Sequence, residues 1–268
     1  MRHILIAQPD TGSIVSGTVG FLMALGQRLT SSGTPWTYKH LTLSDIVLSR
    51  NIFASHVIAD NLYSHVLFID SDMGFAPDTI ERMIAFDKPI VAAACPKRYV
   101  AWDRIHAMAQ ADADQRAADE RISTTELMDA ALHYNVETVR ADGSIFTPRR
   151  QGSYITVPAI GTGIMLVHRD VFEIMLAQGA ARSRPGYRNL PILDTAPLCD
   201  FFSQLETPDG SMLESEDISF CWRWTDQCGG EIWADIDSRI LHYGLRGHAG
   251  RYWDKAHHDF PDLSKAQT

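Results

Sequence analysis

The sequence predicts an α/β fold in which helices flank a mostly parallel central sheet. Short apolar runs at 4–7, 66–69 and 90–94 have the length and composition of strands that are buried on both faces. Between the first two runs, two segments with helical spacing of apolar residues flank a strand-like segment at 36–41. The order strand, helix, strand, helix, strand is typical of a right-handed parallel arrangement.

Turn-forming and capping residues set the expected limits of the first elements. The strand at 4–7 should leave through a loop over 8–12, because Pro and Gly interrupt it there. The helix after it should end at 31–33, which reads Ser-Ser-Gly. Ser44-Asp45 could cap the second helix, which would carry Arg50 on its polar side.

In the middle of the chain a strand leads into charged residues, and the amino-acid composition changes after them. A helix should run from Asp78 to Phe86, with Pro77 near its first turn, and the strand at 89–94 should leave through a basic turn at 95–98. Further on, the Ala-, Asp-, Glu- and Arg-rich stretch 109–131 predicts an exposed helix, and 136–146 predicts a hairpin around an Asp-Gly pair.

The last part of the chain should complete the sheet. We expect strands at 154–158, 164–167, 231–234 and 240–244, helices from Arg169 and within 213–224, and a loop over 182–195. Phe220, Cys221 and Trp224 share one side of the second helix, which indicates a core face, and Gly229-Gly230 should end it. The expected organisation is one domain over 1–268, with a variable excursion at 99–154 and a tail at 245–268.

Composition and charge narrow the class of protein. The chain has 268 residues, of which 45% are hydrophobic and 21% charged, as in globular proteins. Its formal net charge of −9 argues against a broad surface that follows nucleic-acid phosphates. Four cysteines without a Cys-x-x-Cys pair favour buried free thiols over a zinc site or a disulfide frame.

The N-terminal apolar run is too short for a secretion signal, because Gln8, Pro9 and Asp10 interrupt it. No stretch approaches the ~20 apolar residues of a membrane span. The sequence therefore predicts a cytoplasmic or at most peripheral protein without a transmembrane segment.

Two carboxylates follow the strand at 66–69. Asp70 and Asp72 are separated by Ser71, and residues spaced in this way can project to the same side. The carboxyl ends of strands in open α/β sheets are ligand-binding edges, and an all-oxygen site suits Mg²⁺ or Mn²⁺. The alternative interpretation is that these residues form a turn and cap the next helix.

Other candidate residues lie at the ends of other predicted elements. Lys97 follows the strand at 89–94 and could contact phosphate, or could belong to a solvated turn. Gly161 and Gly163 precede the strand at 164–167, where glycine allows close approach of a ligand or marks a bulge. Glu216 and Asp217 fall in the first turn of a helix, where a capping role is the alternative to chemistry.

Taken in order, these motifs resemble nucleotide-sugar glycosyltransferases of the GT-A fold. The stretch 67–72 is similar to the DxD element of that family, 216–217 to its ED helix, and His242 to its closing metal-ligand histidine. The resemblance covers most of the chain except 99–154 and the residues after Gly244.

The resemblance implies roles for particular positions. Gln8, Pro9 and Thr11 would lie near the nucleotide base, Arg50 and Lys97 would contact the diphosphate, and Ser71, Gly161 and Gly163 would also line the donor site. Asp70, Asp72 and His242 would hold Mn²⁺ or Mg²⁺, with Asp70 contacting ribose or metal-bound water. A second histidine, His248, is the alternative ligand.

The resemblance also implies a reaction. Asp217, with Glu216 as its neighbour, would act as general base and deprotonate an acceptor hydroxyl, so that a nucleoside-diphosphate sugar transfers its sugar with inversion. The alternatives are a metal-dependent nucleotidyltransferase and a non-catalytic module that binds nucleotide sugars or glycans. Loop conformation decides the donor base, the sugar and the acceptor, and the sequence leaves these and the oligomeric state open.

Overall fold

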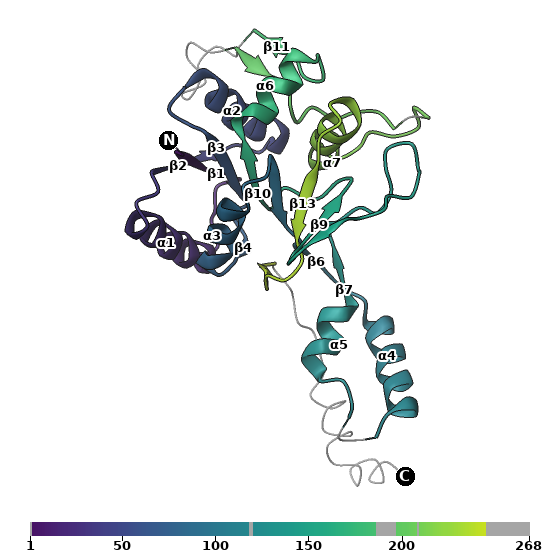
Figure 1. The fold of residues 1–268 in the computed structure, drawn as a ribbon. Helices are drawn as coiled ribbons and strands as arrows, with labels where there is room; N and C mark the ends of the chain where they lie inside the picture. Colours follow the sequence, from purple (N-terminus) through teal and green to yellow (C-terminus); the bar gives the residue numbers. More distant parts are fainter. Residues whose placement is uncertain (1, 118–119, 186–196, 208, 245–268) are drawn as a thin grey trace, which may run out of the picture.

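The computed structural model of the chain describes residues 2–117, 120–185, 197–207 and 209–244. Figure 1 shows a central sheet with helices on both faces and an arm of two helices that projects from one end. The tail at 245–268, most of the expected loop at 182–195 and the second histidine, His248, lie outside the described residues. None of the described helices is long and apolar enough to cross a membrane.

The central sheet has eight strands, and six of them run in one direction. Its order is β2 (Trp36–Thr42), β1 (Ile4–Asp10), β3 (His65–Ile69), β10 (Ile164–His168), β5 (Ile90–Ala93), β13 (Ile232–Asp235), β9 (Tyr154–Val157) and β8 (Arg150–Gln151). Only β10 and β9 run against the others, as their antiparallel pairings with β3, β5, β13 and β8 show. The predicted α/β class with a mostly parallel sheet is confirmed.

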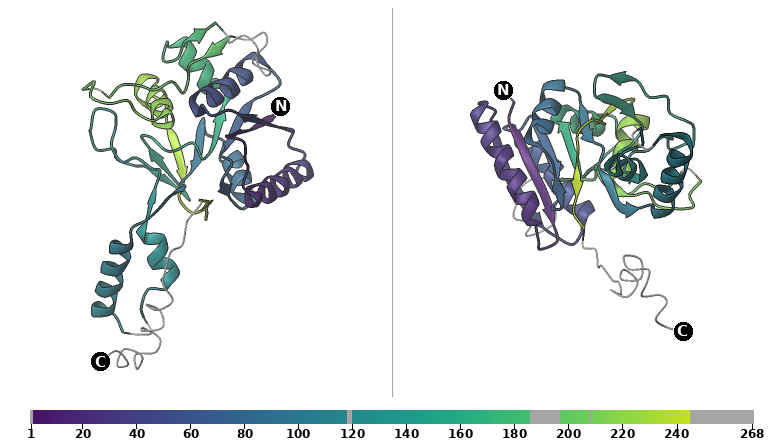
Figure 2. Two further views of the ribbon diagram at one scale, coloured as in Figure 1. Left: turned by 180° about the vertical axis from the view of Figure 1, so that it is seen from behind. Right: turned by 90° about the horizontal axis from the view of Figure 1, so that it is seen from below.

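Side chains alternate between two core layers, one on each face of the sheet. In β1, Ile4 and Ile6 belong to one layer, with residues of α1 (Ser16–Ser31) and α3 (Pro77–Phe86). Leu5 and Ala7 belong to the other layer, which includes residues of α2 (Ile46–Ala59), α6 (Arg169–Ala177) and α7 (Glu216–Trp222). Burial on both faces explains why the strands read as nearly unbroken apolar runs. Figure 2 shows the sheet and the helices that flank it from behind and from below.

The helix that carries the acidic pair continues beyond its α-helical part. A π-helical turn, η1 (Arg223–Gln227), follows α7, and Gly229 ends it with a positive φ of 67°. Phe220, Cys221 and Trp224 are buried as expected. Cys95 and Cys199 are also buried, Cys228 is partly exposed, and all four thiols are free.

The arm is formed by β6 (Pro96–Val100), α4 (Trp102–Gln115), α5 (Thr124–Ala131) and β7 (Leu132–Tyr134). β6 pairs with β7 in antiparallel orientation, so the two strands form the base from which the helices project. Three small pairs complete the described structure: β6 with β7, β4 (Met73–Gly74) with β14 (Leu241–His242), and β11 (Ser183–Arg184) with β12 (Leu198–Cys199).

Three boundary predictions were wrong. Gln8, Pro9 and Asp10 belong to β1, because β1 pairs with β3 only as far as Ala7 and a proline is tolerated beyond that point. The basic turn at 95–98 is largely the strand β6, which gains a partner in β7. The helix expected at 109–131 is interrupted between α4 and α5, where Ser123 starts α5 with a capping box.

Candidate active site

The loop that follows β3 carries Asp70, Ser71 and Asp72, and its backbone is tied to three distant segments. The Asp70 N–H donates to the carbonyl oxygen of Gly163 at 3.0 Å, just before β10. The Ser71 carbonyl accepts from the N–H of Val15 at 2.9 Å, and the Asp72 carbonyl accepts from Tyr243 at 2.9 Å. Because these bonds come from both halves of the chain, the two carboxylates have a fixed backbone at the edge of the sheet.

Asp70 faces a buried guanidinium. Nη2 of Arg50 lies 3.0 Å and 3.2 Å from the two carboxylate oxygens of Asp70, and Nη1 contacts the carboxylate of Glu216. Only 3% of Arg50 is exposed. The guanidinium therefore joins the loop after β3 to the first turn of α7, two elements that are far apart in the sequence.

The expectation that Arg50 lies on a polar side of its helix was wrong. The segment around β12 covers another face of α2, where the Cys199 and Phe202 N–H groups donate to Ser55 and Asn51 at 2.8 Å and 2.7 Å. A helix covered on both sides has no solvated face, so the arginine has to find carboxylates within the protein.

Burial also shifts the pKa of the Glu216 carboxyl. Removal from water raises the pKa of the Glu216 carboxyl, the nearby Asp217 and Asp70 charges act in the same direction, and the Arg50 charge offsets only part of this rise. The partner of the Glu216 carboxylate is the buried guanidinium of Arg50.

Asp72 faces a different pair of groups. Its Oδ2 lies 3.2 Å from Nη1 of Arg98 in β6 and 3.4 Å from Nε2 of His242 in β14. Burial acts to raise the pKa of Asp72, but the hydrogen bond and charge of His242 and the charge of Arg98 outweigh it and lower the pKa. The carboxylate therefore stays ionised near neutral pH, which is the form that binds a cation.

The ring of His242 is oriented by a backbone carbonyl. Its Nδ1 lies 2.7 Å from the carbonyl oxygen of Pro96, and because a carbonyl only accepts, Nδ1 carries the donated hydrogen. Nε2 is left on the side of Asp72. A histidine that donates one ring N–H to a carbonyl and presents the other nitrogen to a carboxylate has the usual orientation of a metal ligand.

Asp217 lies beside Glu216 but points to different partners. Its Oδ1 accepts from the hydroxyl of Ser215 and from the N–H of Ile218, the latter at 2.9 Å. Asp217 is partly exposed, and no cation of the described residues lies within ion-pair distance of it. Both hydrogen bonds go to Oδ1, so Oδ2 receives no hydrogen bond from these two groups.

The positions predicted for the base and for close approach by glycine lie in protein contacts. Gln8 is buried and its Oε1 accepts from the hydroxyl of Tyr38 at 2.8 Å, while its Nε2 has no partner among the described residues. Pro9 is buried in β1 and Thr11 is exposed. A Cβ at Gly161 would approach Asn135 to 2.6 Å, and a Cβ at Gly163 would approach Met73 to 2.9 Å, so both glycines permit tight packing.

Two residues were absent from the predicted set. Arg98 rather than Lys97 contacts Asp72, because alternation along β6 turns neighbouring side chains to opposite sides. Asp10 accepts hydrogen bonds from Thr42, the Gly12 N–H and His40. Burial acts to raise the pKa of Asp10, yet these bonds lower it overall. In the sequence, the adjacent Lys-Arg pair could have indicated Arg98, and the polar end of β1 could have indicated Asp10.

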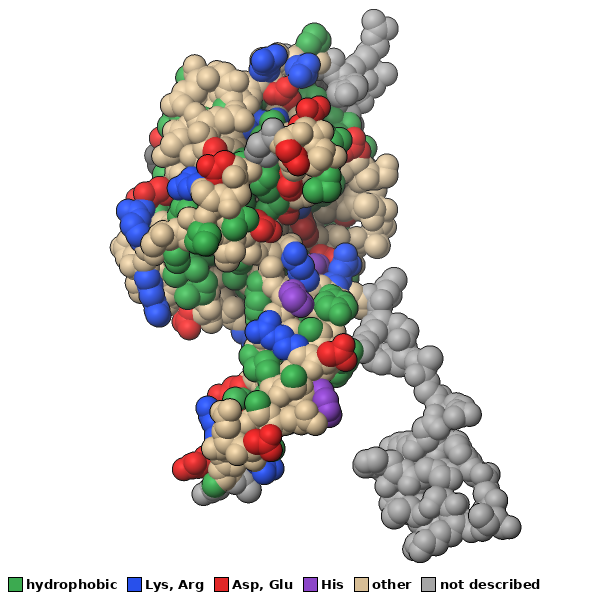
Figure 3. All heavy atoms as spheres, turned by 90° about the vertical axis from the view of Figure 1, so that its right-hand side faces the viewer, with side chains coloured by type: hydrophobic (Ala, Val, Ile, Leu, Met, Phe, Trp, Pro, Cys, Tyr) green, Lys and Arg blue, Asp and Glu red, His purple; other side chains and the backbone are tan. Residues whose placement is uncertain are grey.

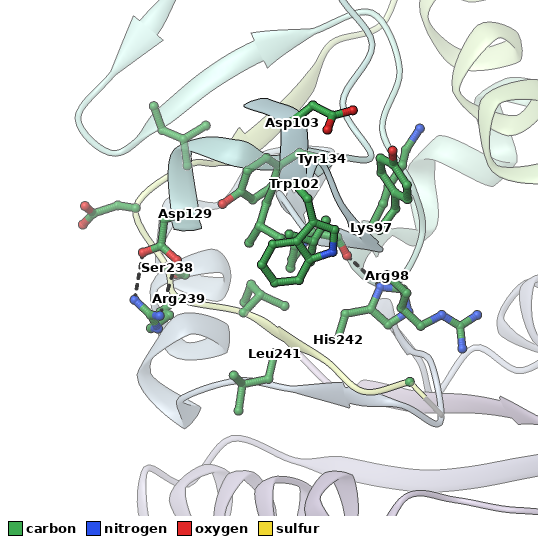
Figure 4. Close-up of a pocket in the computed structure, with 18 residues that line it drawn as sticks. Lys97, Arg98, Trp102, Asp103, Asp129, Tyr134, Ser238, Arg239, Leu241 and His242 are labelled. Atoms are coloured by element: carbon green, nitrogen blue, oxygen red, sulfur yellow. Dashed lines mark hydrogen bonds and ion pairs between the residues drawn. The ribbon is translucent and has the colours of Figure 1, made fainter. Parts of the chain in front are cut away.

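A groove of about 1130 Å³ opens beside Asp72, between the base of the arm and the segment 236–244. Arg98 and His242 lie at one end of this groove, and Arg239, which pairs with Asp129 at 3.0 Å, lies at the other (Figure 4). Lys97 also lines it and is exposed. On the face shown in Figure 3, Lys, Arg and His side chains gather where the arm meets the body, close to acidic side chains of the body.

The donor set fits a divalent cation in part. Of the three predicted ligands, Asp72 and His242 lie together, whereas Asp70 is engaged by Arg50. Within the described residues no group of three His, Cys, Asp or Glu side chains is placed to hold a metal ion. One carboxylate and one oriented imidazole suit Mn²⁺ or Mg²⁺ when water and the substrate supply the remaining oxygens.

We expect the Arg50 contact to be worth more than an exposed ion pair. Arg50→Met should lower the free energy of unfolding by on the order of 2–3 kcal/mol, below the ~3–5 kcal/mol of a fully buried pair because both carboxylates are partly exposed. Urea denaturation measures this loss.

The matched control is Arg28→Met, which breaks a more exposed pair with Glu81 and should lower the free energy of unfolding much less than Arg50→Met does. Adding Glu216→Gln to Arg50→Met should recover part of the loss, because one uncompensated carboxylate is then neutral. Equal losses for the two single variants would contradict the bridging role.

Comparison with known proteins gives solved structures of similar fold. No family model and no curated protein matches the chain. A protein from STIV is 12% identical with a TM-score of 0.42, over 94% of this chain and 98% of the other. A Drosophila β-1,4-galactosyltransferase 7 variant, in complex with manganese, UDP-Gal and xylobiose, is 11% identical with a TM-score of 0.44, over 95% and 79%. GalNAc-T7 with UDP, GalNAc and Mn²⁺ is 12% identical with a TM-score of 0.44, over 93% and 44%.

Proposed function

We propose that this protein is a glycosyltransferase, which moves a sugar from a nucleoside-diphosphate sugar to an acceptor hydroxyl with the help of Mn²⁺ or Mg²⁺. The observation that carries the proposal is the loop after β3, whose two carboxylates belong to separate networks. Asp70 is joined through Arg50 to the helix of Asp217, and Asp72 faces His242 and Arg98. In this proposal the network of Asp70 and Arg50 positions the base, and the network of Asp72 would bind the diphosphate through the cation and Arg98.

The groups around Asp72 suit the leaving nucleotide. Asp72 and His242 would hold the cation, which when bound supplies positive charge that stabilises the diphosphate as it departs. Arg98 lies on the same side, and its guanidinium can exchange the Asp72 carboxylate for phosphate oxygens. Such fixed positive groups lower the barrier because negative charge grows on the diphosphate in the transition state.

Asp217 is the group that we assign as general base. The Ser215 hydroxyl and the Ile218 N–H fix its Oδ1, so its second oxygen can accept the proton of the acceptor hydroxyl. As the acceptor oxygen bonds to the anomeric carbon, the bond from that carbon to the phosphate oxygen breaks and its electrons stay on the nucleoside diphosphate. A single displacement of this kind inverts the anomeric carbon. Glu216 is then a positioning residue, held by Arg50.

The reaction is tested directly with a panel of nucleotide sugars. The full chain with Mn²⁺ should release nucleoside diphosphate from one member of the panel, at a rate that rises when an acceptor is added. Coupled detection of the released nucleotide measures this. Release of pyrophosphate instead would indicate a nucleotidyltransferase, and binding without any release would indicate a module that only binds nucleotide sugars.

Metal-dependent binding should depend on Asp72 and His242. In Asp72→Ala and His242→Ala, calorimetry with Mn²⁺ should show roughly 10- to 100-fold weaker binding of nucleoside diphosphate, because a charged or oriented ligand is lost. Asp114→Ala and His106→Ala, both exposed on α4, are the matched controls and should bind as wild type. If His248→Ala weakens binding and His242→Ala does not, the histidine role belongs to His248.

The base assignment predicts a loss of turnover without a loss of donor binding. Asp217→Asn should lower kcat by ~10²- to 10⁴-fold, the usual contribution of a positioned base, while donor affinity stays close to wild type. A purely structural cap would instead cost ~1 kcal/mol of stability and leave turnover per folded molecule nearly unchanged. Asp226→Asn, an exposed carboxylate on η1, is the control. Proton NMR of the product should show inversion, and retention would refute the single displacement.

A further inference from the structure

The groove beside Asp72 contributes Arg98 and His242 to the proposed donor site, and the rest of its lining has no role there. We propose that it binds the acceptor, and that the acceptor is a neutral oligosaccharide whose sugar ring stacks on Trp102. The inference rests on the proposed function, since that reaction is what makes the occupant an acceptor. It is carried by the aromatic lining, the balance of charge, the volume and the position of the groove.

Aromatic rings line the groove and are exposed to solvent. Trp102 is 52% exposed, Tyr99 64% and Tyr134 40%, and all three come from the arm. In Figure 4 the indole of Trp102 lies across the groove between the Arg239 end and the His242 end. An aromatic face attracts the C–H face of a pyranose ring, while the phenol O–H groups of Tyr99 and Tyr134 can meet hydroxyls.

The charges along the groove balance one another. Its lining includes Lys97, Arg98 and Arg239 against Asp103, Asp129 and Asp237. Arg98 is paired with Asp72 and Arg239 with Asp129, so two of the three cations are already compensated. A polyanion would find little uncompensated positive charge here, whereas a neutral ligand rich in hydroxyls can use both carboxylates and guanidinium groups as hydrogen-bond partners.

The volume favours a chain of sugars over a single small molecule. At about 1130 Å³ the groove exceeds the ~300–1000 Å³ typical of pockets that enclose one small ligand. It runs from the Arg239–Asp129 pair to Arg98 and His242, the two residues that contact Asp72. A bound oligosaccharide therefore has one end beside the place proposed for the donor diphosphate.

The arm explains why such a site is placed at this edge of the sheet. Trp102 is the first residue of α4, directly after β6, and β6 also carries Arg98. The same two-stranded base therefore positions the aromatic surface and one of the groups that face Asp72. Arg239 fixes the segment 236–244 to α5 through Asp129, which keeps the two walls of the groove together.

The test measures glycan binding separately from nucleotide release. The full chain is applied to an array of neutral, sulfated and sialylated glycans, with unmodified peptides on the same array. We expect neutral glycans of two or more units to bind, and Trp102→Ala to weaken that binding roughly tenfold or more, as truncation of an aromatic anchor does. Trp102→Phe keeps a ring and should retain most of the binding. Met23→Ala, a 72% exposed apolar residue on α1, is the control.

Binding only to anionic glycans, only to peptides or to nothing on the array would overturn the inference, as would wild-type affinity in Trp102→Ala. Circular dichroism shows whether each variant is folded. Nucleoside diphosphate release by the wild-type chain, measured without any glycan, separates the two proposals. If release occurs and no glycan binds, only the groove assignment fails; if glycans bind and no donor is cleaved, the transferase assignment fails.

Discussion

The candidate site depends on one buried guanidinium. Arg50 reaches across the end of the sheet to Asp70 and to Glu216, and with 3% of its surface exposed it cannot exchange these partners for water. A buried charge is tolerated only when it is paired, so the loop after β3 and the first turn of α7 are held where Arg50 needs them. Asp217, the next residue along α7, is thereby placed relative to the acidic loop.

The second carboxylate of the loop, Asp72, has an exposed cation as one of its partners. Arg98 is largely exposed, so it can change partner without leaving a buried cation uncompensated, while the carbonyl of Pro96 orients His242. This difference gives the two carboxylates different tasks. In the proposed reaction Asp70 belongs to the framework, and Asp72 would bind the cation.

The arm adds a surface that the sheet does not provide. Its base strand β6 leaves the sheet edge with Arg98 and leads directly into Trp102, so the exposed rings lie beside the Asp72 network. A parallel-sheet core positions reactive groups at strand ends, while the segments inserted after those strands determine what else can bind there. The proposed division between donor and acceptor follows from that arrangement.

The sequence by itself determined the strands, the helices and the strand-end carboxylates, because buried strands, caps and turns are local patterns. Local patterns did not show that the helix expected at 109–131 is interrupted. They did not show the strand β6 either, since β6 is a strand only through its pairing with β7. Likewise, nothing in the sequence near Arg50 showed that β12 covers its helix. Tertiary structure alone decided that Asp70 and Asp72 belong to different networks, and that Arg98 rather than Lys97 faces Asp72, because these contacts join residues 20 or more positions apart.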